Sequence, residues 1–362
     1  MAGQRDESGT STGLRIVHVA ESFASGTASA IRDYVRNYPA AEHHLLYAQR
    51  SEAVVSAAEF AGFTTVAELP DGHAARLRYL RAYALELTAP ALIHAHSSKA
   101  GVYVRLAIRN SAKVPIIYTP HCYSFERRDV GWPARLVFRA AEWALSFNTG
   151  SFSACSAREA TLSRWPLSRP RVVTVPNVAP AASAEATDTT DDGSLCLVGN
   201  GRIGPQKDPE FFATAVRAAR DSVGDVRAVW IGGGESRYVG LLQDCGVEVT
   251  GWLPRADALA VLARADVYLH TAAWEGFPIS IMEASAAGLP VVARNRPYLL
   301  GVDLPIVIDR PEQIADALGE LRSPAARAAV NRRTRSALAG CSDTAQQSAL
   351  RGLYEPYVAG LP

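Results

Sequence analysis

Short apolar runs alternate with segments of helical period along most of the chain. A first series of runs, each bounded by Pro, Gly, Asn or a helical segment, lies at residues 14–20, 91–95, 114–118, 151–155 and 172–175. Two intervening segments each place apolar side chains on one helical face, namely Ile31, Tyr34, Val35 and Tyr38, and Leu77, Leu80, Ala84 and Leu87. Strands that alternate with amphipathic helices are typical of βα units around a parallel sheet.

A second series of the same kind follows a polar stretch. Residues 178–193 contain small residues and clustered acids without an apolar period, and they are predicted to form a linker. The strands of the second series are predicted at residues 195–199, 227–232, 247–251, 266–270 and 289–293. The predicted fold class is therefore α/β, with two doubly wound domains that face each other across a cleft. Ligands of such sheets bind beyond the carboxyl ends of the strands.

Composition narrows the class of protein. A chain of 362 residues with 48% hydrophobic and 20% charged residues is long enough for two domains. It has 37 basic and 36 acidic residues, so its formal charge of +1 does not favour nucleic acid as a partner. The five cysteines form no CxxC pair, which indicates neither a zinc site nor a disulfide framework and fits a reducing compartment.

Two further features concern location. The first dozen residues are polar and small, and they lack the apolar core of a secretory signal. No apolar run approaches the ~20 residues that are needed to span a bilayer. We therefore expect a cytoplasmic protein, and peripheral contact with the inner face of the membrane stays open.

The loop after the first strand of the second series carries two cations. GNGRIG at 199–204 matches GxGxxG, which raises the hypothesis of a nicotinamide-dependent oxidoreductase. The prolines that follow delay the helix to about Pro209, whereas the dinucleotide motif needs its last glycine at the start of the helix. We interpret the loop as one that presents Arg202 and Lys207 to a diphosphate. Two ordinary surface cations are the alternative.

Glycines and carboxylates follow later strands of the same series. IGGGES at 231–236 permits close approach of the backbone to a ligand, or forms a tight turn without one. In the segment 270–293, Pro278 suits the first turn of a helix whose N-terminus favours an anionic or hydroxyl-rich ligand. Glu275 precedes this helix and Glu283 lies within it. The two carboxylates accept hydrogen bonds from sugar hydroxyls, or they belong to a solvated face.

Taken in order, these motifs resemble a known family. G-R-x-x-x-x-K, the GGG turn, E-G-F-P-x-x-x-x-E and A-x-A-x-G-x-P-V-V-A look like the donor site of family-four retaining GT-B glycosyltransferases. HAHSSKAG at 94–101 and TPHCYSF at 119–125 also resemble this family, notably its bacterial polysaccharide and glycolipid transferases. The resemblance implies a tail at 1–13, an acceptor-binding Rossmann-like domain at 14–177, the linker at 178–193, a donor-binding domain at 194–340 and a helix at 341–362 that crosses back to the first domain.

The resemblance also implies roles for single residues. Arg202 and Lys207 would bind the donor diphosphate, and Glu283 would bind the ribose hydroxyls. Glu275 would hold hydroxyls of the transferred sugar, and His121 would reach that sugar near its reacting end. The remaining residues implied at the donor are Gly201, Gly232, Gly233, Trp252, Gly276, Phe277 and Ile279.

The acceptor side departs from the family. Cys122 stands where the family usually has a glycine, and Ser25-Gly26-Thr27 replaces its usual glycine pair. Gly26, His96 and Cys122 are therefore only weak candidates for acceptor contacts. The basic and aromatic stretch 124–145 either lies on an anionic bilayer or forms a buried helix with a solvated basic edge.

The function that we predict follows from this resemblance. A retaining transferase would move a sugar from a nucleotide diphosphate sugar, UDP favoured over GDP, to a hydroxyl of a glycan, a lipid-linked molecule or a small molecule. We expect no cofactor besides this co-substrate and no metal, because no DxD motif follows a strand. The alternatives are a sugar-nucleotide epimerase of the same two-domain plan and a non-catalytic sugar-nucleotide-binding protein, and a nicotinamide oxidoreductase ranks last.

Overall fold

The computed structural model describes residues 13–23, 25–48, 57–88, 90–181 and 194–358. The chain forms two compact units. Unit 1 consists of Met1–Phe125, Pro133–Asn177 and Asp343–Pro362, and unit 2 consists of Glu126–Trp132 and Val178–Ser342. Residues 1–12 of the predicted tail at 1–13 and residues 182–193 of the predicted linker at 178–193 lie outside the described residues.

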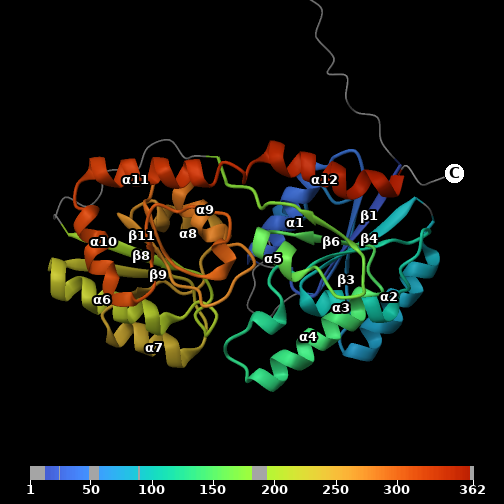
Figure 1. The fold of residues 1–362 in the computed structure, drawn as a ribbon, viewed down its shortest axis with the longest axis horizontal. Helices are drawn as coiled ribbons and strands as arrows, with labels where there is room; N and C mark the ends of the chain where they lie inside the picture. Colours follow the sequence, from blue (N-terminus) through green and yellow to red (C-terminus); the bar gives the residue numbers. More distant parts are fainter. Residues whose placement is uncertain (1–12, 24, 49–56, 89, 182–193, 359–362) are drawn as a thin grey trace, which may run out of the picture. The chain divides into compact units, whose positions relative to one another are not determined.

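Unit 1 is built on a parallel sheet of seven strands in the order β3-β2-β1-β4-β5-β6-β7 (Figure 1). The strands are β1 Arg15–Ala20, β2 Glu42–Tyr47, β3 Thr65–Glu68, β4 Ala91–His96, β5 Ile116–Thr119, β6 Ser151–Ala154 and β7 Arg171–Thr174. The helices are α1 Ser25–Asn37, α2 His73–Glu86, α3 Ser98–Ala107, α4 Trp132–Ser146, α5 Ala157–Leu162 and α12 Asp343–Val358. Short 3-10 turns lie at Ala57–Phe60 and Ser124–Glu126.

Helices cover both faces of this sheet, because successive side chains of a strand point to opposite faces. Val17 and Val19 of β1 pack in one apolar cluster with Leu80 of α2 and Tyr103 of α3. On the other face, the buried side chains come from β1, β4, α1 and α12, and they include Ile16, Leu92, Tyr34, Tyr38, Leu350, Leu353 and Tyr354. The prediction that the last helix packs on the first domain is thereby confirmed.

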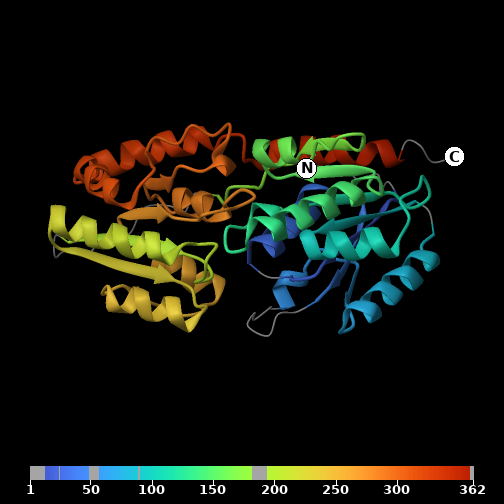
Figure 2. The same cartoon turned by 60° about the horizontal axis from the view of Figure 1, so that its bottom comes forward.

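Unit 2 holds a parallel sheet of six strands in the order β10-β9-β8-β11-β12-β13. Most of this unit is coloured from yellow to red in Figure 2. The strands are β8 Leu195–Asn200, β9 Val226–Ile231, β10 Glu248–Val249, β11 Val267–His270, β12 Val291–Arg294 and β13 Val307–Ile308. The helices are α6 Pro209–Val223, α7 Ser236–Asp244, α8 Arg255–Leu262, α9 Ile279–Ala286, α10 Ile314–Glu320 and α11 Pro324–Ala337. Short 3-10 turns lie at Pro297–Leu299 and Pro311–Gln313.

The core of unit 2 again lies between the sheet and its helices. Phe212 of α6 meets Trp230 of β9 edge to face, with ring centroids 5.1 Å apart. Both rings belong to an apolar cluster that extends to Leu318 of α10. Helices α9 and α11 pack against each other, and each also contacts β12.

The predicted fold class is confirmed, since both units are Rossmann-like α/β domains with parallel sheets. Each predicted strand is present, with bounds that differ by a few residues. Three strands were not predicted. β2 has the sequence EHHLLY, in which a glutamate and two histidines interrupt the apolar run, and β3 and β13 are short strands with exposed residues. Within the described residues, no helix is both long and apolar enough to cross a membrane.

Candidate functional site

The donor-site candidates follow four neighbouring strands of unit 2. Arg202 comes after β8, Gly233 after β9, Trp252 after β10 and Glu275 after β11. These strands are adjacent in the order β10-β9-β8-β11. The candidates therefore share the carboxyl edge of one sheet, which is where ligands of parallel α/β sheets bind.

The loop after β8 leads into a helix that starts late. α6 begins at Pro209, and Asp208 caps it by accepting a hydrogen bond from Phe211 N at 3.1 Å. Asp208 has a φ of 50° and is paired with Arg294 at 2.5 Å. The predicted delay of the helix is confirmed, and residues 205–208 separate the last glycine of GNGRIG from the helix. This geometry differs from that of a dinucleotide motif, in which the helix begins at the glycines.

The glycine turn after β9 packs against the loop after β8. A Cβ on Gly232 would overlap Gly201 O, and a Cβ on Gly234 would overlap Ile203 O. Ile203 N donates to Gly233 O at 2.8 Å, which joins the two loops. The glycines are therefore required by the close approach of two backbone segments.

An ion pair lies at the centre of this edge. Lys207 Nζ is 2.6 Å from Glu275 Oε1, and the side chains are only 18% and 13% exposed. Gln206 donates to the other carboxylate oxygen of Glu275 at 3.3 Å. Thr271 Oγ1 donates to Lys207 O and thereby ties the β8 loop to the β11 loop. The Glu275 carboxylate is thus held by two donors and compensates the charge of Lys207.

Arg202 differs from Lys207. Its side chain is exposed, and it forms no ion pair with any residue that the structure describes. Lys207 is therefore neutralised by Glu275, whereas Arg202 is an exposed cation without an ion-pair partner among the described residues. An anion that bound Lys207 would have to compete with Glu275 for its ammonium group.

The second glutamate has a partner that the sequence did not indicate. Glu283 lies in α9, and its Oε1 is 2.7 Å from Arg255 Nη2, at the start of α8. Trp252 precedes α8 and is 48% exposed, and its Nε1 lies beside Gly233. Glu283 is thus paired with Arg255, which follows Trp252 by three residues in the chain. The loop residues Gly276 and Phe277 precede α9, which begins at Ile279, and the Phe277 side chain is buried.

In unit 1 the acceptor-side candidates also follow carboxyl ends of neighbouring strands. Gly26 is the second residue of α1 after β1 and is exposed, and His121 comes after β5 and is half-buried. His96 ends β4, is fully buried, and has both ring nitrogens bonded, to His18 at 3.0 Å and to His121 at 3.1 Å. His96 therefore has neither surface nor a ring nitrogen for an acceptor.

The turn that carries His121 adopts an unusual backbone. His121 and Cys122 have φ angles of 51° and 101°, in the left-handed region that favours glycine. The buried Glu159 fixes this turn, because its carboxylate accepts hydrogen bonds from Cys122 N at 2.7 Å and from Cys155 N at 2.8 Å. Burial raises the pKa of Glu159, and the two backbone donors oppose that rise.

Three histidines of unit 1 stand close enough to share a metal ion. One ring nitrogen of each of His18, His94 and His96 lies within 4.8 Å of the corresponding nitrogens of the other two, and the three rings have six nitrogens in all. All six are hydrogen-bonded, among themselves, to His43, to His121 or to the hydroxyls of Thr119 and Tyr354. An ion would bind here only by replacing these hydrogen bonds.

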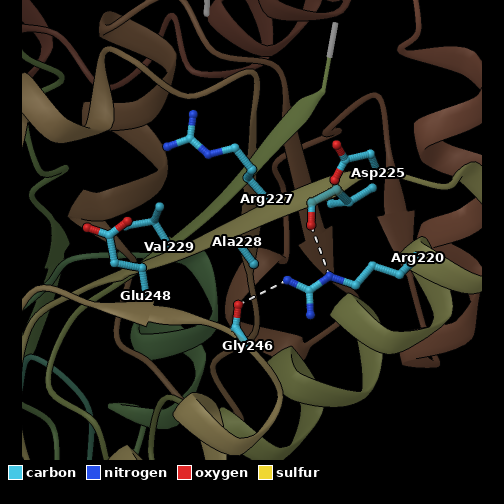
Figure 3. Close-up of a pocket in the computed structure, with 8 residues that line it drawn as sticks. Arg220, Asp225, Arg227, Ala228, Val229, Gly246 and Glu248 are labelled. Atoms are coloured by element: carbon cyan, nitrogen blue, oxygen red, sulfur yellow. Dashed lines mark hydrogen bonds between the residues drawn. The ribbon is translucent and has the colours of Figure 1, made fainter. Parts of the chain in front are cut away.

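A hollow in unit 2 lies away from the candidate edge. It has a volume of about 370 Å³ and lies at the amino end of β9 (Figure 3). Its lining includes Arg220, Asp225, Arg227, Gly246 and Glu248. The Arg220 guanidinium donates to Val226 O and to Gly246 O, each at 3.0 Å. Because it opens at the opposite ends of the strands, the hollow is not part of the donor site.

Two known families match the chain. The family described as glycosyl transferases group 1 matches residues 193–323, and the glycosyl transferase 4-like domain matches residues 25–178. Together the two segments span well over half of the sequence. The chain belongs to the family-4-type GT-B glycosyltransferases.

Individual proteins resemble this glycosyltransferase along most of its length. An Escherichia coli UDP-Gal:alpha-D-GlcNAc-diphosphoundecaprenol alpha-1,3-galactosyltransferase is 27% identical over an alignment of 228 residues, and the alignment covers 56% of this chain and 57% of that protein. Sucrose-phosphate synthase from Thermosynechococcus elongatus has a TM-score of 0.77 at 17% identity, covering 96% of this chain and 100% of the other. HepE from Anabaena, solved with UDP-glucose, has a TM-score of 0.69 at 16% identity, covering 94% and 99%.

Two residues of the glycosyltransferase escaped the sequence analysis although they hold candidate residues in place. Glu159 fixes the His121 turn, and Arg255 pairs with Glu283. Glu159 stands three residues after Ser156, the spacing of a helix cap, and Glu159 N does donate to Ser156 Oγ. That signal predicts a helix start and does not predict the contact with Cys122. Arg255 carries no local signal, because its partner lies on another helix.

Proposed function

We propose that this glycosyltransferase moves a hexose from a UDP-sugar to a hydroxyl of a glycan or of a lipid-linked acceptor, with retention at the anomeric carbon. The observation that carries the proposal is the exposed cation Arg202 in the same loop as the paired Lys207, at the carboxyl edge of the unit 2 sheet. The name of the galactosyltransferase relative includes a UDP-sugar and a diphosphoundecaprenol, and HepE was solved with UDP-glucose, which supports this donor class.

Donor binding would give Lys207 and Glu275 new partners in place of each other. A diphosphate carries negative charge that attracts both Arg202 and Lys207. When Lys207 turns to the phosphate, Glu275 loses a partner and becomes free to accept hydrogen bonds from sugar hydroxyls. Glu283, held by Arg255, would accept bonds from the ribose, and Trp252 offers a flat surface to the base. The same two cations would stabilise the charge that develops on the departing phosphate.

Retention fits this arrangement better through one-face transfer than through a glycosyl-enzyme. Double displacement needs a carboxylate that attacks the anomeric carbon. Glu275 is the candidate from the sequence. In the proposed complex one of its oxygens keeps the hydrogen bond from Gln206 and the other accepts from sugar hydroxyls, so the carboxylate binds the sugar and does not attack it. We propose that the departing phosphate deprotonates the acceptor, and that protein cations replace a metal at the diphosphate. No cofactor besides the co-substrate is then needed.

The first experiment is a thermal-shift panel with UDP, GDP, ADP, NAD and the common UDP- and GDP-sugars. A ligand that binds only the folded state raises the melting temperature. We expect a shift with UDP and its sugars, lost in Arg202→Ala and Lys207→Ala and kept in Arg227→Ala, which removes an exposed cation at the other end of β9. A shift with NAD alone would overturn the proposal.

Product analysis then distinguishes transfer from epimerisation. Incubation with a UDP-hexose and no acceptor leaves the sugar configuration unchanged, or releases hexose and UDP, if the protein is a transferase. An epimerase converts the UDP-hexose to its epimer without any acceptor. Appearance of the epimer would favour the alternative enzyme of the same two-domain plan.

We further propose that α4 rests on an anionic membrane, where a lipid-linked acceptor would be found. The outward face of this helix is apolar: Leu136 is 55% exposed, Val137 65% and Phe147, just after the helix, 56%. Trp143 lies on the same face and donates to Pro166 O at 2.9 Å, which brings the exposed Leu167 beside it. We call these five side chains the α4 patch.

The charges around the α4 patch have one sign. Arg139 of α4 is exposed, and Arg164 and Arg169 are exposed in the segment that carries Leu167. The only acid of α4 is Glu142, which is buried and paired with Arg105 at 2.8 Å. An apolar face rimmed by arginines and free of exposed acids suits the surface of an anionic bilayer. The helix therefore has an apolar solvated face, where the sequence offered a basic one.

Liposome co-sedimentation tests the membrane contact. We expect binding to vesicles that contain phosphatidylglycerol at low salt, and little binding to pure phosphatidylcholine. Leu136→Ser combined with Val137→Ser should abolish binding, whereas Leu85→Ser, which changes an exposed leucine of α2, should not. Equal sedimentation of both variants, or none of the wild type, would overturn this part of the proposal.

A further inference from the structure

Four histidines form a continuous chain of hydrogen bonds across the sheet of unit 1. His43 Nδ1 is 2.9 Å from His18 Nε2, His18 Nδ1 is 3.0 Å from His96 Nε2, and His96 Nδ1 is 3.1 Å from His121 Nε2. The chain starts at a backbone group, because His43 Nε2 is 2.8 Å from Tyr38 O. His43, His18 and His96 come from β2, β1 and β4, which are neighbours in the sheet. We call this series the histidine chain.

The Tyr38 carbonyl fixes the direction of every bond in the histidine chain. A carbonyl oxygen only accepts, so His43 carries its proton on Nε2. A neutral imidazole has one donor and one acceptor nitrogen, so His43 Nδ1 accepts from His18 Nε2. In the same way, His18 Nδ1 accepts from His96 Nε2, and His96 Nδ1 accepts from His121 Nε2. Each of the four rings is therefore the Nε2–H tautomer.

The four rings have one donor and one acceptor nitrogen each only while they are neutral, and burial keeps them neutral. His18 and His96 are fully buried, and burial holds their pKa values well below the ordinary value. Burial also lowers the pKa of His43, and it lowers the pKa of His121 to about 4. The neighbouring histidines add to the effect, since a charge on one ring opposes a charge on the next.

The opposite tautomers would conflict with the backbone. If His121 carried its proton on Nδ1, its Nε2 would have to accept, and each earlier ring would reverse in turn. His43 Nε2 would then present a lone pair to the Tyr38 oxygen at 2.8 Å. Two acceptors at that distance repel, and each would be a buried polar group without a hydrogen-bond partner, which destabilises the fold. The contact of His43 with Tyr38 O thus determines the tautomer of His121 at the other end of the histidine chain.

We propose that His43, His18 and His96 are positioning residues that hold His121 as the Nε2–H tautomer, so that His121 Nδ1 presents a lone pair to a hydroxyl of the donor sugar. The inference rests on the proposed function for the presence of the sugar, whereas the tautomer follows from the chain alone. A lone pair at this place binds hydroxyls, which donate, and gains nothing from a fluorine in the same position.

A fifth histidine provides a matched control. His94 is as deeply buried as His96, and their ring centroids are 4.1 Å apart. Its nitrogens are bonded to Tyr354 OH at 2.8 Å and Thr119 Oγ1 at 2.7 Å, so it lies outside the histidine chain. His94→Leu removes a buried imidazole without breaking the chain. His96→Leu breaks it, and His96→Gln restores a donor and an acceptor.

Nitrogen NMR of the ¹⁵N-labelled protein without ligand reads the tautomers directly. We expect protonated Nε2 and unprotonated Nδ1 on His43, His18, His96 and His121 of the wild type, and the same for His121 in His94→Leu. In His96→Leu we expect both tautomers of His121, and in His96→Gln a return to Nε2–H. A protonated Nδ1 on wild-type His121, or an unchanged His121 in His96→Leu, would overturn the proposal.

Kinetics with singly deoxyfluorinated UDP-hexoses tests the use of the lone pair. We expect one fluorinated position to raise KM at least tenfold in the wild type and in His94→Leu, and this difference to shrink below threefold in His96→Leu. If no fluorinated position is penalised, His121 Nδ1 binds no sugar hydroxyl and that part of the proposal is wrong. If no UDP-hexose binds at all, the proposed function fails while the NMR result still decides the tautomer.

Discussion

Cys122 is a residue whose side chain is poorly suited to its backbone. Its φ of 101° lies where a side chain is strained by roughly 1–3 kcal/mol, and glycine is not. Glu159 holds the conformation in place through Cys122 N. The turn therefore stores strain next to His121, the residue that ends the histidine chain.

We predict that Cys122→Gly stabilises unit 1 by about 1 kcal/mol, because strain relief exceeds the added backbone entropy of the unfolded chain. Urea denaturation of the variant measures the change in the free energy of unfolding. Cys122→Ala is the control, because alanine keeps the strain while it removes the thiol. Equal stabilisation by both variants would contradict the strain and point to the thiol itself.

At the donor edge, the proposed function assigns the diphosphate to two cations, Arg202 and Lys207. We predict that Arg202→Ala and Lys207→Ala each lower turnover at least 100-fold, or about 2.7 kcal/mol of transition-state stabilisation, since each removes a positive charge that would stabilise the departing phosphate. Steady-state rates with a UDP-hexose measure the loss. Arg227→Ala should keep a normal rate, and near-normal rates for Arg202→Ala would remove it from the site.

At the scale of elements, α4 is anchored by one buried charge pair. Glu142 is paired with Arg105 of α3, and its other carboxylate oxygen accepts from Tyr118 OH at 3.1 Å. The Arg105 guanidinium also lies over the Tyr118 ring, 4.0 Å from its centroid. The inner side of α4 is thus polar and paired, while its outer side carries the α4 patch.

We predict that Glu142→Leu destabilises unit 1 by about 3–5 kcal/mol, because it leaves the Arg105 charge buried without its partner. The combined change Glu142→Leu with Arg105→Met should recover most of that loss, since no charge stays buried. Chemical denaturation of the three proteins gives the comparison. A double variant as unstable as the single one would show that the pair does more than neutralise charge.

The strands and helices also show how much of the fold can be predicted from the sequence. The apolar runs 195–199 and 289–293 predict buried parallel strands, because no polar side chain interrupts them. β2 was missed because its buried His43 and His44 read as polar in the sequence, although His43 hydrogen-bonds within the sheet. The donor-site motifs were found since they follow strands. Their partners were not, because pairs such as Arg255 with Glu283 form only when distant helices meet.

For the whole molecule, the buried histidines set the response to acid. Burial holds the pKa values of His18, His94 and His96 well below 6.5, and that of His121 is about 4. Between pH 6.5 and these lower values the unfolded chain binds more protons than the folded one, so stability falls as the pH falls. Glu159, with a raised pKa, acts in the opposite sense.

We predict that the free energy of unfolding of unit 1 falls from pH 7.5 to 5.5, by more than the ~1.4 kcal/mol per pH unit that one histidine can supply. Urea denaturation at several pH values measures the slope. His94→Leu should lower this slope by the contribution of one histidine. A flat profile would show that the rings are protonated in the folded protein, which would also break the directional argument for the histidine chain.

Metal dependence is a further property of the whole enzyme. We predict that treatment with EDTA leaves turnover unchanged, because Arg202 and Lys207 supply the positive charge at the diphosphate. Assays before and after removal of EDTA, with and without added Mg²⁺, provide the measurement. Loss of activity that Mg²⁺ restores would contradict this prediction.

Unit 1 is assembled from parts of the chain that are synthesised far apart in time. Its face formed by Ile16, Leu92 and Tyr34 is completed by Leu350 and Leu353 of α12, and the whole of Val178–Ser342 is translated in between. At roughly 5–20 residues per second, that interval lasts on the order of ten seconds. During this time the nascent domain displays an apolar surface beside the ribosome, and this surface is a natural substrate for a chaperone.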